Sequence, residues 1–111
     1  MDLVKTVARF EVHLVDLDPT QGSEIQKTRP CLVVSPDELN ASLNTLIIAP
    51  MTTGGKPYPT RVPILFQAVA GRVALDQLRT VDRSRLVKKL GAITSVEAQA
   101  VVSCLQQLFA M

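Results

Sequence analysis

The chain has 111 residues, of which 47% are hydrophobic and 20% are charged, as in an ordinary globular protein, which excludes a disordered or fibrous chain. This length suits one hydrophobic core, so we expect a single domain over residues 1–111. Apolar runs such as Leu46–Ala49 are far shorter than the roughly 20 residues of a membrane span. The net charge is +2, but it is unevenly distributed: residues 1–54 hold four basic and seven acidic side chains, whereas residues 55–111 hold eight basic and three acidic side chains. Such an asymmetry is typical of proteins with a polyanionic partner.

The chain begins with a lead-in and a strand–loop–strand unit. Residues 1–9 show no period and lack the layout of a signal peptide, so we expect a loose segment and a cytoplasmic protein. A stretch rich in β-branched residues over 10–17 predicts a strand that ends at the turn dipeptide Asp18-Pro19. A polar loop over 18–29 and a short apolar strand over 31–34 follow.

The middle of the chain predicts further short strands. Ser35 and Glu38 form a potential capping box around Pro36, which predicts a short helix that ends near residues 40–44. Pro63 is typical of an edge strand, and Asp82 of a short capped turn. The strands are expected at 45–51, 62–66, 71–78 and 86–93, with a Gly- and Pro-containing loop at 52–59.

The end of the chain predicts an amphipathic helix. Thr94 and Glu97 form a second capping box, and apolar residues then recur every three or four positions, at Ala98, Val101, Val102, Leu105, Leu108 and Phe109. This stripe can cover one face of the sheet, and part of it can instead seal a dimer. We therefore expect a mainly β fold, a small antiparallel barrel with short connecting helices and a C-terminal helix.

Few residues are suited to metal binding or base stacking. One histidine, His13, and two cysteines, Cys31 and Cys104, cannot form a structural zinc site of several Cys and His ligands, and we expect all three to be packed side chains. Four aromatic residues and no tryptophan are few for a protein that binds nucleic acid mainly by stacking.

The polar loop is the first candidate site. About a dozen residues without secondary structure are uncommon in a small domain unless they have a function. Glu24 can accept a proton from a nucleophile, and Arg29 can bind phosphate oxygens as negative charge develops. The alternative is a solvated loop with a weak surface ion pair.

Two other segments are candidates. Thr52 and Thr53, followed by two glycines, can present hydroxyl and backbone donors to a phosphate, or can form an ordinary turn. Alternation over Asp76–Thr80 would direct Asp76, Leu78 and Thr80 to one side and Gln77 and Arg79 to the other, so that one or two polar groups can point into a cleft. The alternative is an ion pair on the face of the strand. A cluster of basic residues follows, which can contact a phosphate backbone or form an ordinary solvent-exposed surface. Its members are Arg79, Arg83, Arg85, Lys88 and Lys89.

Taken in order, these motifs resemble one family over nearly the whole chain, the MazF/PemK (Kid) toxins of bacterial toxin–antitoxin pairs. The similar stretches are Val15–Thr20, Gly22–Glu24, Thr28–Pro30, Leu32–Pro36, Pro50 with Thr52-Thr53, Asp76–Asp82 and Arg85-Leu86. The resemblance implies an SH3-like barrel of the CcdB/PemK type, a homodimer and a sequence-specific endoribonuclease. It also implies that the enzyme cuts single-stranded RNA without a metal or other cofactor and is inhibited by an acidic, partly disordered MazE-like antitoxin.

The resemblance also implies roles for individual residues. Glu24 would be the base that activates the 2′-hydroxyl, Arg29 the phosphate clamp and Thr52 a strand-end hydroxyl at the cleavage site. The expected substrate-binding residues are Ser23, Lys27, Thr28, Thr53, Asp76, Gln77, Arg79 and Arg85. Kid-like members carry an arginine two residues before the aspartate that matches Asp76; Ala74 stands there in this chain, so an arginine–aspartate catalytic pair is not expected.

Two alternatives use the same fold. One is a non-enzymatic inhibitor of a cellular target, as the related CcdB toxin is of DNA gyrase. The other is a cleavage-dead homologue that only binds its antitoxin.

Overall fold

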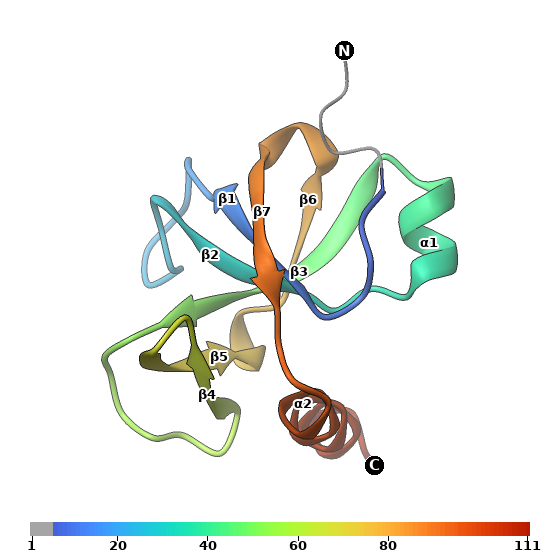
Figure 1. Ribbon diagram of the computed structural model, residues 1–111. Helices are drawn as coiled ribbons and strands as arrows, with labels where there is room; N and C mark the ends of the chain where they lie inside the picture. The colour runs from blue at the N-terminus through green and yellow to red at the C-terminus, as the bar shows by residue number, and fades with distance from the viewer. Residues whose placement is uncertain (1–5) are drawn as a thin grey trace.

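An antiparallel sheet curls into an open barrel, and the C-terminal helix lies outside it (Figure 1). The computed structural model describes residues 6–111, so the expected lead-in at residues 1–9 lies partly outside the described residues. The elements are β1 (Glu11–Asp16), β2 (Thr28–Val33), α1 (Asp37–Ser42), β3 (Thr45–Thr52), β4 (Arg61–Phe66), β5 (Val69–Ala74), η1 (Leu75–Gln77), β6 (Arg79–Asp82), η2 (Arg83–Arg85), β7 (Leu86–Ala92) and α2 (Ser95–Leu108). Neither described α-helix is long and apolar enough to cross a membrane.

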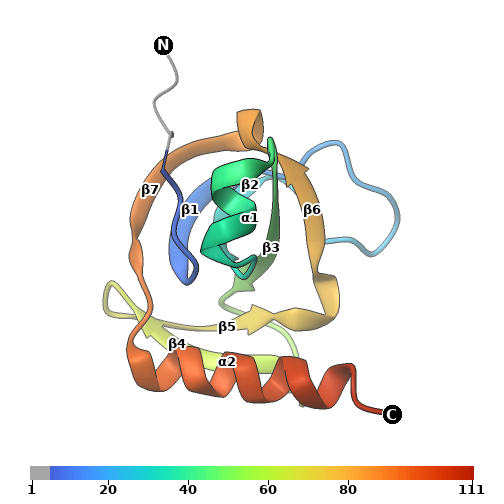
Figure 2. The same cartoon turned by 90° about the vertical axis from the view of Figure 1, so that its right-hand side faces the viewer.

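The strand order explains the curl. The strands pair in the order β4-β5-β3-β2-β1-β7, and β6 pairs with β3 beside this path. β3 therefore has three partners: β2 lies on one edge, while β6 pairs with residues 45–48 and β5 with residues 51–52. Figure 2 shows the result, with α2 running beneath β4 and β5.

Two hydrophobic clusters lie on opposite faces of the central strands. Cys31 and Val33 face one cluster, while Leu32 and Val34 face the other, with Val101 of α2. In β3, Ile48 faces the first cluster and Ala49 the second. Because both faces are covered, these strands read as continuous apolar runs instead of an alternating pattern.

The C-terminal helix confirms its prediction. Thr94 accepts a hydrogen bond from the amide of Glu97 at 3.2 Å, and the Glu97 carboxylate accepts from the amide of Thr94 at 3.0 Å, which completes the capping box. The same carboxylate accepts from the amide of Leu65 at 2.8 Å and so joins the helix to β4. Val101 is buried and Leu105 packs against the same cluster, but Phe109, which follows the helix, is 69% exposed, so the apolar stripe is not covered at its end.

Several other predictions hold. β4 is an edge strand, as Pro63 predicts, and the turn at Asp82 is capped by its carboxylate, which accepts from the amide of Ser84 at 2.9 Å. His13 and Cys31 are buried, while Cys104 is only partly buried.

Three local predictions are wrong. The strand expected over 71–78 ends at Ala74, where the 3₁₀ turn η1 begins, and a separate strand, β6, starts at Arg79, because the chain changes from one end of β3 to the other. Ser35 does not cap α1: its buried hydroxyl donates to Asn40 Oδ1 at 2.6 Å and accepts from the amide of Ile47 at 3.1 Å. The polar loop ends at Lys27, because Thr28 already pairs with Asp16 of β1.

Candidate active site

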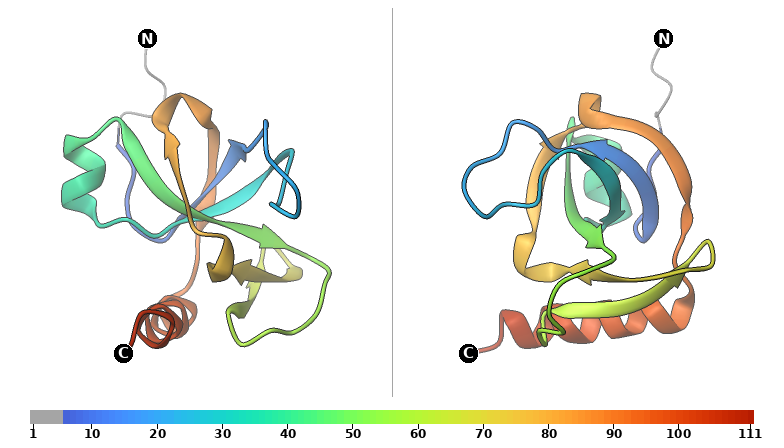
Figure 3. Two further views of the ribbon diagram at one scale, coloured as in Figure 1. Left: turned by 180° about the vertical axis from the view of Figure 1, so that it is seen from behind. Right: turned by 90° about the vertical axis from the view of Figure 1, so that its left-hand side faces the viewer.

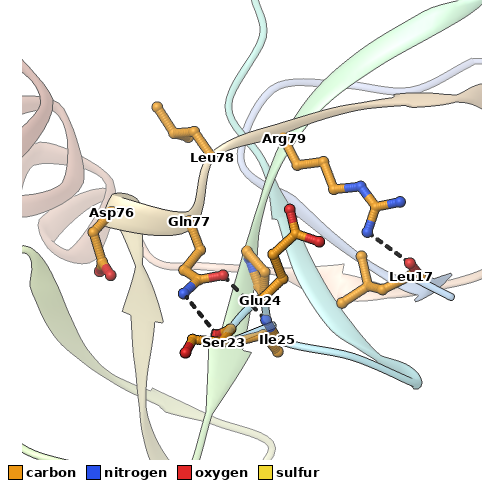
Figure 4. Close-up of a pocket in the computed structure, with 9 residues that line it drawn as sticks. Leu17, Ser23, Glu24, Ile25, Asp76, Gln77, Leu78 and Arg79 are labelled. Carbon is orange, nitrogen blue, oxygen red and sulfur yellow. Dashed lines mark hydrogen bonds between the residues drawn. The ribbon is translucent and has the colours of Figure 1, made fainter. Parts of the chain in front are cut away.

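A pocket of about 360 Å³ lies between the β1–β2 loop, residues 17–27, and the segment 76–79 (Figure 4). Pro50 of β3 also contributes to its wall. The expected site residues that line it are Ser23, Glu24, Asp76, Gln77 and Arg79. Residues more than fifty positions apart in the sequence therefore meet in one cleft.

Glu24 is exposed at the rim of this pocket and is oriented by its own loop. Its Oε1 atom accepts from the amide of Gln21 at 2.6 Å, and its amide donates to the carbonyl of Gln21 at 3.1 Å. Gly22 between them has φ +55°, a conformation that other residues adopt only with strain. The sequence thus forms a tight turn that presents a carboxylate.

The amide side chain of Gln77 connects this turn to η1. Gln77 Oε1 accepts from the amide of Ile25 at 3.1 Å, and Gln77 Nε2 donates to the carbonyl of Ser23 at 3.5 Å (Figure 4). These two hydrogen bonds fix the backbone on both sides of Glu24. The structure shows that Gln77 holds the loop, and its expected contact with substrate stays a prediction.

Two of the expected substrate arginines support the base of the same loop. Arg79 Nη1 donates to the carbonyl of Leu17 at 2.6 Å. Arg85 Nη1 donates to the carbonyl of Asp16 at 3.1 Å and to that of Asp18. A contact of either guanidinium with substrate stays a prediction.

Arg29 and Thr52 lie outside this pocket. Arg29 is on β2, paired with Val15, and its Nε donates to the carbonyl of Gln26 at 3.0 Å. Thr52 ends β3 and, with Thr53, lines a separate apolar pocket of about 210 Å³. If the β2–β3 register, in which Cys31 pairs with Pro50, is continued by two residues, Arg29 faces Thr52 across the sheet.

The expected catalytic trio is therefore distributed around one corner of the sheet. Glu24 is on the loop, Arg29 at the start of β2 and Thr52 at the end of β3. Lys27 and Thr28 are exposed where the loop joins β2 and do not line the pocket of Glu24. No group of three or more His, Cys, Asp or Glu side chains within residues 6–111 is placed to hold a metal ion.

Asp76 has an arginine partner that sequence reasoning missed. Arg61 Nε and Nη2 donate to the two carboxylate oxygens at 2.7 and 2.9 Å, and Thr60 Oγ1 donates at 3.1 Å. The hydrogen bonds from Arg61 hold the pKa of Asp76 below its usual value. Arg61 lies opposite Ala74 in the β4–β5 ladder, so an arginine–aspartate pair does form, through a cross-strand neighbour.

The chain resembles known proteins over most of its length. A family model described as PemK-like, MazF-like toxin of type II toxin–antitoxin system matches residues 8–109. The chain is 33% identical over 100 residues to endoribonuclease MazF9 of Mycobacterium tuberculosis, which covers 80% of this chain and 84% of the relative. It is 35% identical over 88 residues to the endoribonuclease toxin MazF of Escherichia coli K12, with 78% and 79% covered.

Solved structures agree with the fold. MazF from Deinococcus radiodurans superposes with a TM-score of 0.84 at 28% identity, covering 96% of this chain and 98% of that one. A MazE–MazF complex from the same organism gives 0.77 at 25% identity, covering 96% and 97%. These matches confirm the expected small β fold with its C-terminal helix and do not favour the CcdB-like alternative. The chain belongs to the PemK-like, MazF-like family of toxins from type II toxin–antitoxin systems.

Proposed function

We propose that this protein is the toxin of a toxin–antitoxin pair and an endoribonuclease that cuts single-stranded RNA at a short sequence. The observation that carries the proposal is the exposed Glu24 carboxylate at a pocket rim, on a loop whose backbone Gln77 holds, with Arg29 on the adjoining strand. Relatives named endoribonuclease support the same reaction class.

The proposed reaction uses the 2′-hydroxyl of the RNA as the nucleophile. Glu24 takes the hydroxyl proton, the 2′-oxygen bonds to phosphorus, and the bond from phosphorus to the 5′-oxygen breaks. Arg29 bears a permanent positive charge and stabilises the charge that develops on the phosphate oxygens, and Thr52 donates a hydrogen bond to them. Water supplies the proton for the leaving oxygen, which gives a 2′,3′-cyclic phosphate and a 5′-hydroxyl end.

The test is cleavage of a mixed RNA pool in EDTA, with the ends mapped by sequencing. We expect products with 5′-hydroxyl ends, which accept a labelled phosphate without prior treatment. Glu24→Gln and Arg29→Ala should each lower kcat/KM at least about a hundredfold, the usual contribution of a catalytic base or charge stabiliser. Glu38→Gln on α1 is the matched control, because it removes a carboxylate away from the pocket.

The outcomes separate the alternatives. Cleavage that requires an added metal would contradict the proposed chemistry. An Arg29→Ala protein that stays fully toxic in cells would favour a non-enzymatic inhibitor. A wild-type protein that binds its antitoxin but cuts no RNA would be a cleavage-dead homologue.

We also propose an acidic antitoxin segment, a homodimer and a cytoplasmic location. Residues 55–111 hold eight basic and three acidic side chains, which suits an acidic segment that folds on binding. The MazE–MazF complex of D. radiodurans supports this kind of partner. Inhibition by the antitoxin should weaken at high salt.

The proposed homodimer would cover apolar surface at the end of α2. Leu108, the last residue of α2, and Phe109, which follows it, are 38% and 69% exposed. Phe109→Ser should shift the mass measured by light scattering from dimer toward monomer.

A further inference from the structure

A second, larger pocket lies on the side of the β4–β5 hairpin that α2 covers. Its volume is about 530 Å³, and its walls come from the β3–β4 loop, β4, β5 and the second half of α2. Figure 3 shows these elements together, with β4 and β5 above the helix. None of the residues proposed for catalysis lines it.

The lining is cationic and aromatic. Arg61 and Arg72 both contribute, Tyr58 is the aromatic residue, and no Asp or Glu is among the lining side chains. Ser103 and Gln107 of α2 add polar groups on the opposite wall. Guanidinium groups beside an aromatic ring are the combination that binds a nucleotide, because the ring stacks on the base and the cations bind phosphate.

The aromatic ring is held in place before any ligand binds. The Arg61 guanidinium lies 5.6 Å from the centre of the Tyr58 ring, and Asp76 fixes that guanidinium through two hydrogen bonds. A backbone hydrogen bond of 2.9 Å from the amide of Arg61 to the carbonyl of Tyr58 tightens the turn. Pro57 and Pro59 restrict the backbone on both sides of the tyrosine, which is still 50% exposed.

The ion pair of Arg61 and Asp76 joins this pocket to the candidate active site. Asp76 lines the pocket of Glu24, whereas Arg61 lines the second pocket, and the two side chains are in direct contact. The ion pair is therefore a direct contact between the walls of the two pockets.

We propose that the second pocket is a subsite for a nucleotide that flanks the cleaved bond, with its base stacked on Tyr58 and its phosphate bound by Arg72. The inference rests on the proposed endoribonuclease function. It assigns to Tyr58, Arg61 and Arg72 a role in binding RNA outside the reacting nucleotides. It also means that Tyr58 supplies stacking although the chain is poor in aromatic residues.

The sequence provides a direct probe of this subsite. Tyr58 is the only tyrosine, and the chain has no tryptophan, so the tyrosine emission of the protein comes from this residue alone. The titrant is a 2′-O-methyl RNA of the mapped cleavage sequence with several flanking nucleotides, which cannot be cut because its 2′-oxygens are blocked. We expect a saturable change in tyrosine emission that is lost when the flanking nucleotides are removed.

Variants then separate stacking from charge. Tyr58→Leu and Arg72→Gln should each lower kcat/KM at least about fivefold for a long substrate and leave a minimal substrate unchanged, since one stacked base contributes this much or more. Arg9→Gln is the matched control, because it removes one exposed positive charge that lines neither pocket. If loss of the tyrosine disturbs the loop, the Arg72→Gln variant, which retains Tyr58, still tests the subsite.

Three results would overturn the inference. One is RNA binding, measured by anisotropy, without any change in tyrosine emission. Another is an equal loss of activity on long and minimal substrates in both variants. The third is an emission change with a poly-glutamate peptide but not with RNA, which would make this an acidic-peptide site. By contrast, a protein that binds the probe with the tyrosine change but cleaves no RNA would contradict the proposed function and leave the subsite intact.

Discussion

Removal of the Gln77 side chain should loosen the loop that carries Glu24. A neutral hydrogen bond contributes about 0.5–1.5 kcal/mol, and the 3.5 Å contact with Ser23 lies at the weak end of that range. With the 3.1 Å bond from Ile25, Gln77→Ala therefore costs about 1–2 kcal/mol of loop order. If Glu24 acts only from the ordered loop, kcat/KM falls by at most about 5- to 30-fold, and the full effect requires that the loop be only marginally ordered before the change.

Gln77→Glu should be no better than Gln77→Ala. A carboxylate can still accept from the amide of Ile25, but it cannot donate to the carbonyl of Ser23. It also adds a negative charge to a pocket lined by Glu24 and Asp76.

The assay pairs kcat/KM on a synthetic RNA with hydrogen exchange of the loop. The amide of Ile25 should lose protection in Gln77→Ala, while amides of β2 and β3 should not change. Gln99→Ala, an exposed glutamine on α2, is the control. Unchanged exchange at Ile25 together with full activity would refute the positioning role, and an equal loss of protection across the barrel would show a general loss of stability instead.

The remaining predictions concern stability and the geometry of the sheet. Thr94→Ala removes the cap of α2 and should cost about 1 kcal/mol of unfolding free energy, measured by urea titration, while Thr94→Ser should cost much less. Gly71→Ala would place a Cβ 2.7 Å from the carbonyl oxygen of Thr52, so it should cost about 1–3 kcal/mol of unfolding free energy. It should also displace Thr52 together with its hydroxyl and so lower the activity. Gly54→Ala, whose Cβ would meet no atom within 4 Å, should have little effect. Because Arg61 lowers the pKa of Asp76, their pairing stabilises the fold above pH about 4, and this contribution is lost as the pH falls through the lowered pKa. Asp76→Asn should therefore lower Tm at pH 7, and the difference in Tm from the unchanged protein should become smaller as the pH is lowered.

Features that depend on interactions between neighbouring residues could be predicted from the sequence alone. The capping box at Thr94 and the period that follows it predict α2, since these interactions span three or four positions. The apolar runs at 31–34 and 46–49 mark strands that contribute side chains to the hydrophobic clusters on both faces of the sheet. The ordered motifs of the loop and of Asp76–Asp82 were enough to identify the family.

Contacts between residues that are distant in the sequence depend on the fold and could not be predicted from local patterns. Arg61 reaches Asp76 through the β4–β5 register, and a shift of one residue would direct it to the other face of the sheet. The chain changes partner strand at η1 because β3 shares one edge between β5 and β6, which alternation along the sequence does not reveal. For the same reason, Arg79, predicted to bind substrate, has the carbonyl of Leu17 as its partner: pairing between distant strands, rather than local pattern, brings these groups together.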